Sequence, residues 1–208
     1  VLDRGVMFSE SVYEVIPLHL GQLFEYGKHM ARLKASFEQV CQQPFPQKQV
    51  TQWVSEYLLM INPCSSYGLY IQLTAGNTSI RNHLKTNPSP LPTCIIHQTY
   101  AEAINLKKYA RGFKAIALED QRAKMSNLKT VSLAFNTYSL NKAHQLGYDD
   151  AVFTRDDCLV EAASSNIFAV INQILVTPPL EGIVPGITRD VILRIAKEHN
   201  IPFMIRPI

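Results

Sequence analysis

Three stretches of this sequence carry side chains whose chemistry and order could build one site. Lys129 lies in a largely uncharged window, residues 125–141, Glu161 ends a short apolar stretch, and Thr188 follows the glycine of GITRD. Removal from water lowers the pKa of a lysine toward that of a nucleophilic amine. A carboxylate followed by small hydroxyl residues can hydrogen-bond a planar ligand, and the free N–H groups at a helix start can bind a phosphate.

Each of these signals also has an ordinary structural interpretation. The lysine could bury its stem and expose its ammonium, the acid could lie in a solvated turn, and GITRD could be a capped helix with Thr188 as N-cap. Considered together, however, an amine, a carboxylate and a phosphate cup are the three anchors that pyridoxal phosphate requires, for its aldehyde, its ring nitrogen and its phosphate. The order of the three stretches therefore favours one cofactor site.

Composition narrows the class of protein. The chain has 208 residues, of which 47% are hydrophobic and 18% charged, with a formal net charge of +3. It therefore has enough apolar residues for a full core, and no run of Lys and Arg favours nucleic acid. There is no membrane-spanning stretch and no secretory leader, so we expect a soluble cytoplasmic protein. The four cysteines and six histidines have no metal-ligand spacing, and we expect no metal site.

The hydrophobic patterns predict an α+β arrangement of the elements that must position these residues. We expect a hairpin around Gly21 and amphipathic helices on either side of Pro44 and Pro46. The predicted elements are strands at 12–20, 69–74, 93–99, 114–117, 151–154, 166–171 and 174–177, and helices from 28 to before Pro44 and at 48–60, 135–146 and 188–199. On the last helix we expect Val191, Ile192, Ile195 and Ala196 to face inward. These elements divide into an N-terminal domain (1–100), a linker (101–112) and a C-terminal domain (113–208).

Five motifs in order resemble the fold-type IV family of pyridoxal-phosphate enzymes. They are DRGVMFSESVYEV (3–15), HMARLKAS (29–36), LKTVSL (128–133), EAASSNIF (161–168) and GITRDVI (186–192). The family includes D-amino-acid aminotransferases, branched-chain aminotransferases and aminodeoxychorismate lyases. The resemblance spans nearly the whole chain and implies an α+β, two-domain, D-amino-acid aminotransferase-like fold. It also implies a homodimer, and a chain truncated at both ends relative to the family.

The resemblance also implies roles for individual residues. Lys129 matches the lysine that binds the cofactor's aldehyde, and Glu161 matches the acid beside the pyridine nitrogen; their separation, 161 − 129 = 32 residues, is similar to the family's. Arg32 matches the arginine that binds the phosphate, for which a guanidinium fork is well suited. The remaining matches are Ile187 and Thr188 in the phosphate cup, Ser164 and Ser165 in the hydroxyl segment, and Tyr13 at the mouth of the substrate pocket.

The substrate class depends on two further motifs. Arg81 and His83 resemble the Arg and His that hold the substrate carboxylate in D-amino-acid aminotransferases, although a solvated basic loop is the ordinary alternative. Where the family has FGDG, this chain has FSES at 8–11, which we expect to alter the shape or strand path near Tyr13. The predicted activity is transfer of an amino group between an amino acid, including a D-amino acid, and a 2-oxo acid. The alternatives are aminodeoxychorismate lyase, branched-chain aminotransferase and a non-catalytic relative.

Overall fold

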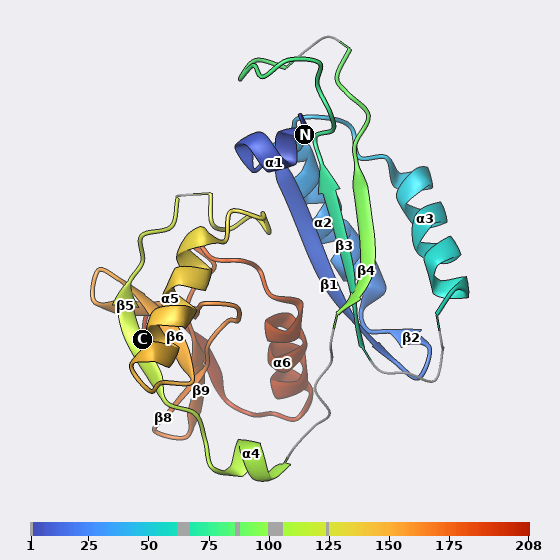
Figure 1. Cartoon of the computed structure of the whole chain (residues 1–208). Coiled ribbons are helices and arrows are strands. Elements are labelled where there is room, and N and C mark those ends of the chain that lie inside the picture. The colour runs from blue at the N-terminus through green and yellow to red at the C-terminus, as the bar shows by residue number, and fades with distance from the viewer. Residues whose placement is uncertain (1, 62–66, 86–87, 100–105, 124) are drawn as a thin grey trace. The chain divides into compact units, whose positions relative to one another are not determined.

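The chain folds into two compact units. The computed structural model describes residues 2–61, 67–85, 88–99, 106–123 and 125–208 (Figure 1). Unit 1 comprises residues 1–103 together with Leu128–Ser132, and unit 2 comprises residues 104–127 together with Leu133–Ile208. Among the described residues, no helix is both long enough and apolar enough to cross a membrane.

Unit 1 contains a four-stranded sheet covered by two long helices. Its elements are α1 (Arg4–Phe8), β1 (Ser11–His19), β2 (Gln22–Leu23), α2 (Tyr26–Cys41), α3 (Gln47–Leu59), β3 (Tyr67–Thr74) and β4 (Cys94–Thr99). The strand order is β2-β1-β3-β4, and every neighbouring pair is antiparallel. α2 packs against β1 and α3 packs against β4 (Figure 1).

The core of unit 1 follows from the two periods in its sequence. In β1, Val12 and Ile16 face the helices because alternate residues of a strand point to the same side, and neither is exposed at all. In α2, Leu33 and Phe37 are four residues apart and lie on one helix face, and both are also buried in this core. Burying an aliphatic or aromatic side chain of this size contributes roughly 1.5–3 kcal/mol. The same periods assign Glu14 to the helix side of β1 and Tyr13 to the opposite side.

The segment Leu128–Ser132 joins unit 1 by pairing with β1. Thr130 forms an isolated antiparallel bridge with Val12, and the Tyr13 N–H donates to the Lys129 carbonyl at 3.0 Å. The sequence-based division placed Lys129 in the C-terminal domain, whereas the structure groups it with unit 1. The hydrophobic pattern shows no sign of this pairing, because it depends on a backbone contact between segments far apart in the chain.

Unit 2 contains two three-stranded sheets and two longer helices. Its elements are α4 (Leu106–Ala110), β5 (Ala115–Glu119), α5 (Ala134–Gln145), β6 (Asp150–Arg155), β7 (Cys158–Ala162), β8 (Ala169–Ile171), β9 (Ile174–Thr177), α6 (Ile187–Glu198) and β10 (Phe203–Ile205). The strand orders are β5-β6-β7 and β10-β9-β8. α5 packs on β6, where Ala143, Ala151 and Phe153 are fully buried.

The structure confirms the predicted hairpin and the four predicted helices, as α2, α3, α5 and α6, and it corrects three details. Helix α6 begins after Gly186 as N-cap, without a side-chain cap, so Thr188 lies inside the first turn instead of capping it. Ile195, which was expected to face inward, is 44% exposed. The strand predicted at 166–171 is shorter, with β8 starting only at Ala169. Of the predicted linker, residues 101–105 lie outside the described residues, and α4 occupies most of the rest.

The FSES segment does not disturb the strand path near Tyr13. β1 pairs with β3 in continuous register from Ser11 to Leu18. Ser9, the C-cap of α1, adopts the left-handed conformation that a glycine would take most readily, with φ 56°. The Ser11 hydroxyl is buried and donates to the Leu73 carbonyl at 3.0 Å. Two serines therefore occupy the positions of the family's glycines while the strand remains regular.

Candidate active site

Lys129 lies beside Tyr13 at the edge of β1. Its ammonium nitrogen is 4.3 Å from the centre of the Tyr13 ring, a cation–π distance. Its backbone N–H donates to the Ser36 hydroxyl of α2 at 3.4 Å. Ser36 is one helical turn after Arg32, on the same face of α2. The backbone of Lys129 is thus bonded to both β1 and α2, and this fixes the point from which its side chain extends.

Arg32 is held by a carboxylate that the sequence analysis did not select. Its Nε and Nη2 donate to the two oxygens of Glu14 at 2.6 and 2.7 Å. Glu14 is completely buried, and its Oε2 also contacts Nδ1 of His29 at 2.7 Å. Burial raises the pKa of Glu14, but the hydrogen bonds from Arg32 and His29 outweigh it and hold the pKa below its ordinary value. A two-point contact of this kind fixes the plane of the guanidinium.

Arg81 and His83 both lie against the ring of Phe8. The Arg81 guanidinium carbon is 5.1 Å from the ring centre, and the His83 ring centre is 4.9 Å from it. Arg4 donates to the carbonyls of Asn82 and His83, each at 2.8 Å. The structure thus brings the two expected substrate-binding residues together on one loop, which the buried Arg4 anchors.

Glu10, which lies in the FSES segment, is the ion-pair partner of Arg4. Glu10 receives two hydrogen bonds from Arg4, at 2.8 and 2.7 Å. Only 1% of the Arg4 side chain is exposed, so its charge requires such a partner. Lys85 adds a second ion pair to Glu10 at 3.6 Å. Phe8 and Glu10 together therefore support the loop that carries Arg81 and His83.

In unit 2, Glu161 is a buried carboxylate near the end of β7. It is 4% exposed and forms an ion pair with Arg122. Its other oxygen, Oε2, is 3.5 Å from the amide nitrogen of Asn166. Burial raises the pKa of Glu161, and although hydrogen bonds from Arg122 and from the Val184 N–H act in the opposite direction, the pKa stays above its ordinary value. The charge on Glu161 therefore depends on its partners.

Asn166 connects Glu161 to the turn that opens α6. Its amide donates to the Val184 carbonyl at 3.0 Å. A Cβ placed on Gly186 would lie 1.7 Å from the Asn166 side-chain oxygen, so only glycine fits at this helix start. Because α6 has no side-chain cap, its first N–H groups are not used by a side chain at the N-cap. Ile187 is buried and Thr188 is exposed at this end.

Ser164 and Ser165 follow Glu161 in an exposed turn. The Ala162 N–H donates to the Ser165 carbonyl at 2.7 Å and closes this turn. The turn keeps both hydroxyl side chains at the end of β7, next to the acid.

The expected site residues are distributed over both units. Unit 1 holds Lys129, Arg32, Tyr13, Arg81 and His83, and unit 2 holds Glu161, Ser164, Ser165, Ile187 and Thr188. Four supporting residues were missed, and they are Glu14, Arg122, Asn166 and Asp120, which accepts hydrogen bonds from Arg122. The signal for Glu14 is present in the sequence, since it occupies an inward position of β1 between Val12 and Ile16. Within the described part of the chain, no three His, Cys, Asp or Glu side chains are grouped to hold a metal ion.

Comparison with known proteins identifies the family. Residues 11–208 match the Amino-transferase class IV family. The D-alanine aminotransferase of Listeria monocytogenes serotype 4b is 31% identical over 201 residues, which are 96% of this chain and 70% of the relative. The chain therefore belongs to the class IV aminotransferases, which are pyridoxal-phosphate-dependent enzymes, and the transaminase prediction is confirmed.

Solved structures confirm the fold. A branched-chain aminotransferase from Thermoproteus uzoniensis, solved with norvaline, superimposes with a TM-score of 0.85 at 22% identity, covering the whole of this chain and 72% of that one. A 4-amino-4-deoxychorismate lyase, described as putative, from Legionella pneumophila gives a TM-score of 0.82 at 22% identity, covering the whole of this chain and 76% of that one. Since a transaminase and a lyase match equally well, the fold by itself does not distinguish the two reactions.

Proposed function

We propose that this chain binds pyridoxal phosphate through Lys129, Glu161 and Arg32 and transfers the amino group of a D-amino acid to a 2-oxo acid. One observation carries the proposal. The ammonium of Lys129 lies over Tyr13, and the next residue in β1, Glu14, holds Arg32. Residues from three separate stretches thus come together within unit 1.

The residues present suit this cofactor. Unit 1 supplies the primary amine of Lys129, which suits the cofactor's aldehyde. It also supplies the guanidinium of Arg32, whose plane is fixed and which suits a phosphate. Unit 2 supplies a buried carboxylate and a helix that starts without a side-chain cap. These features suit a ring nitrogen and phosphate oxygens. When bound, the cofactor withdraws electrons from the substrate's Cα and carries the amino group between the two half-reactions.

The protein's own residues would then direct the proton transfers. With the cofactor bound, Lys129 would be the base that takes up the proton from the substrate's Cα and later releases it. Glu161 accepts a hydrogen bond from the ring nitrogen and favours its protonated form. Arg32 in unit 1 and the start of α6 in unit 2 are the groups that would hold the phosphate, and such contacts would fix the orientation of the ring.

Arg81 and His83 are proposed to bind the substrate's α-carboxylate. Both are donors on one loop, and a guanidinium suits a carboxylate geometrically. The identity to D-alanine aminotransferases, 31% over nearly the whole chain, supports a D-amino acid as amino donor. We further propose a homodimer in solution, as the family resemblance implies.

A three-substrate assay tests the proposed reaction. We expect the protein, supplied with pyridoxal phosphate, to convert D-alanine and 2-oxoglutarate to pyruvate and glutamate, with L-alanine and aminodeoxychorismate as comparisons. Exclusive turnover of aminodeoxychorismate would assign a lyase instead, and exclusive turnover of L-alanine would contradict the D-amino-acid assignment.

A charge-preserving variant tests the proposed carboxylate contact. Arg81→Lys keeps the positive charge but not the guanidinium fork. We expect it to raise the KM for D-alanine about tenfold with a smaller change in kcat, because a two-point contact is reduced to one. Arg111→Lys, which alters an exposed ion pair with Asp149, is the matched control. Equal KM values for the two variants would exclude Arg81 from carboxylate binding.

A further inference from the structure

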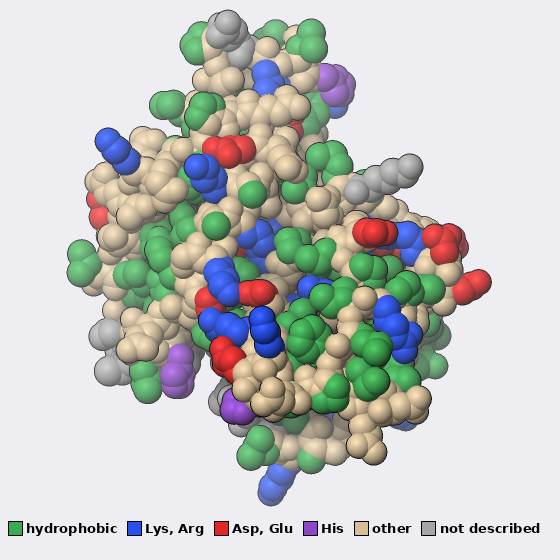
Figure 2. Space-filling model, turned by 180° about the vertical axis from the view of Figure 1, so that it is seen from behind, with side chains coloured by type: hydrophobic (Ala, Val, Ile, Leu, Met, Phe, Trp, Pro, Cys, Tyr) green, Lys and Arg blue, Asp and Glu red, His purple; other side chains and the backbone are tan. Residues whose placement is uncertain are grey.

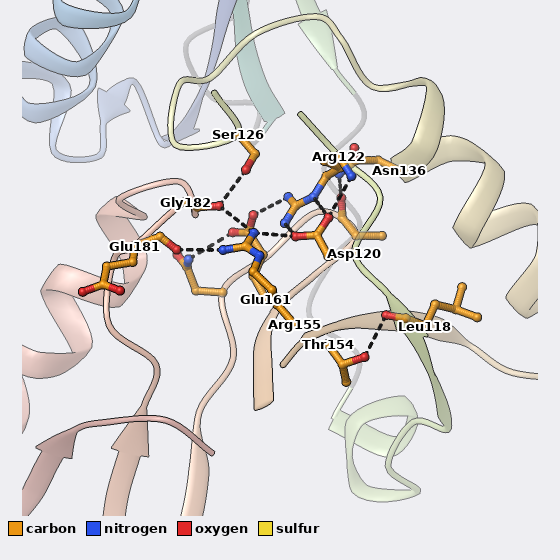
Figure 3. A network of polar contacts seen from close by, with 12 residues as sticks. Leu118, Asp120, Arg122, Ser126, Asn136, Thr154, Arg155, Glu161, Glu181 and Gly182 are labelled. Carbon is orange, nitrogen blue, oxygen red and sulfur yellow. Dashed lines mark hydrogen bonds and ion pairs between the residues drawn. The ribbon is translucent and has the colours of Figure 1, made fainter. Parts of the chain in front are cut away.

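A chain of four charged side chains in unit 2 ends at Glu161. Arg122 reaches Glu161 with Nη1, and its Nε and Nη2 each donate to Asp120 at 2.9 Å (Figure 3). Asp120 also accepts a hydrogen bond from Arg155 at 2.7 Å. Charges therefore alternate in the order Glu161, Arg122, Asp120, Arg155, with two negative and two positive groups.

Three members of this chain are removed from water. The exposed fraction of the side chain is 9% for Arg122, 1% for Asp120 and 5% for Glu161, whereas it is 39% for Arg155. An unpaired charge at the buried positions would be strongly unfavourable, so each carboxylate depends on a guanidinium. Arg122 contacts both of these buried carboxylates, Asp120 and Glu161.

The position of Arg122 is fixed from several directions. Its backbone N–H donates to Asp120 at 3.0 Å, in addition to the two guanidinium contacts. The guanidinium carbon lies 4.6 Å from the centre of the Phe153 ring. Phe153 belongs to the core of unit 2 and is fully buried, so the guanidinium lies over a ring that is packed in that core. Asp120 and Phe153 together leave Arg122 pointing at Glu161.

We propose that Arg122 is a positioning residue that keeps Glu161 ionised and fixed as the acceptor for the cofactor's ring nitrogen, and that Asp120 holds Arg122 in that position. This inference rests on the role of Glu161 in the proposed function. Two residues outside the expected site, Arg122 and Asp120, would then control the charge on Glu161. The proposed reaction depends on this charge. Arg122 contacts neither substrate nor cofactor in this role.

The electrostatic directions agree with this geometry. For Arg122, burial lowers the pKa, but hydrogen bonds to Asp120 and Glu161 outweigh burial and raise it, so the guanidinium stays charged. For Asp120, burial raises the pKa, but the bonds from Arg122 and Arg155 outweigh burial and lower it. Glu161 is the exception, because burial keeps its pKa above the ordinary value even with Arg122 in place. Loss of Arg122 would therefore raise the pKa of Glu161 further.

The titration of Glu161 in the cofactor-free protein provides the test. Carboxyl carbons of glutamate are labelled with ¹³C, and the Glu161 signal is assigned with a Glu161→Gln variant. We expect Arg122→Gln to raise the pKa of Glu161 by about one unit or more, since a buried carboxylate loses its cationic partner. Arg111→Gln, which removes the exposed ion pair with Asp149, is the matched control and should leave the signal in place. An unchanged Glu161 titration in Arg122→Gln would overturn the inference.

A charge-preserving variant keeps the proposal testable if Arg122→Gln fails to fold. Arg122→Lys retains one positive charge but cannot contact both carboxylates with the same geometry. We expect the pKa of Glu161 in this variant to rise by about half a unit, less than in Arg122→Gln. If the pKa of Glu161 did not rise in Arg122→Lys, a positive charge alone would suffice, and the positioning role of Arg122 would be overturned.

Binding of pyridoxal phosphate to the protein supplies a second readout. We expect Arg122→Gln to weaken cofactor binding about tenfold, because Glu161 binds the ring nitrogen less well when protonated. If wild-type protein binds no cofactor, the proposed function fails while the titration still decides the role of Arg122. If wild-type protein binds and Arg122→Gln binds equally well, the inference alone fails.

Discussion

At the scale of single residues, Glu14 shows how a charge in an apolar pattern can be informative. It interrupts the inward-facing series Val12, Glu14, Ile16 of β1, yet it is completely buried. A buried carboxylate at such a position requires a cationic partner, and Arg32 provides it at 2.6 Å. The alternation in the sequence predicts where Glu14 points, but it does not predict which cation on α2 meets it.

Replacement of Glu14 by glutamine should destabilise the protein. We expect Glu14→Gln to lower the free energy of unfolding by about 3 kcal/mol, because Arg32 and His29 lose their buried acceptor. Urea unfolding at neutral pH measures this change. The matched control is Glu56→Gln on the exposed face of α3, where we expect a change within about 0.5 kcal/mol. A result for Glu14→Gln inside the range of the control would contradict the structural role.

The same pair should make stability depend on pH. Because its partners hold the pKa of Glu14 below its ordinary value, Glu14 contributes fully above that ordinary value. Its contribution is lost as the pH falls through the lowered pKa of the folded state. We expect the difference in unfolding free energy between wild type and Glu14→Gln to shrink from about pH 5 to about pH 2. A difference that stays constant over this interval would show that folding does not lower the pKa of Glu14.

Position 186 is a second place where a close contact within unit 2 determines the residue type, because only glycine fits against Asn166. Gly186→Ala would place a methyl group against the Asn166 oxygen, so we expect a loss of about 1–3 kcal/mol in stability and weaker cofactor binding. Thermal unfolding and cofactor titration measure the two effects. Gly27→Ala in α2 is the control, since a Cβ there meets nothing within 4 Å and helix propensity favours alanine. If both variants behaved alike, the close approach to Asn166 would be refuted.

At the scale of elements, most of the fold could be predicted from the sequence. β1 with its hairpin turn, and helices α2 and α3, follow from clear periods of two and 3.6 residues. The short helix α1 was not predicted, because five residues give too little periodicity to recognise. Thr188 was mistaken for an N-cap because GITRD contains both a glycine and a threonine at the helix start, and only the backbone shows which one precedes the first turn.

The candidate site was predictable where motifs are local and unpredictable where contacts are distant. Lys129, Glu161 and Arg32 each lie in a recognisable motif. Arg122 does not, since its significance comes from Glu161, which lies 39 residues further along the chain. The pairing of Lys129 with β1 likewise depends on a contact that no local pattern encodes.

The core beneath β3 should contribute strongly to the stability of unit 1. Leu69 has no exposed surface and belongs to the cluster that includes Phe37 and Val50. We expect Leu69→Ala to lower the free energy of unfolding by about 2–5 kcal/mol through lost burial and the cavity it leaves. Leu59→Ala removes the same atoms at a site that is 87% exposed and should change it by less than about 0.5 kcal/mol. Urea unfolding measures both changes. Similar losses of unfolding free energy in the two variants would place Leu69 outside the core.

At the scale of the whole molecule, the candidate site residues are divided between the two units. Unit 1 holds Lys129 and Arg32, and unit 2 holds the buried Glu161 and the start of α6. On the face shown in Figure 2, Lys and Arg side chains are interspersed with Asp and Glu, so charges of both signs mix there. Such a surface has no extended field of one sign to attract a polyanion.

Borohydride reduction followed by peptide mapping tests the central claim most directly. Wild-type protein mixed with pyridoxal phosphate should develop a visible absorption band. Reduction should then fix the cofactor on the peptide that contains Lys129, and mass spectrometry should place the added mass on that residue. Lys129→Ala should show neither the band nor the label, while Lys142→Ala on helix α5 should keep both. Attachment to another lysine, or a band that survives in Lys129→Ala, would contradict the assignment of Lys129.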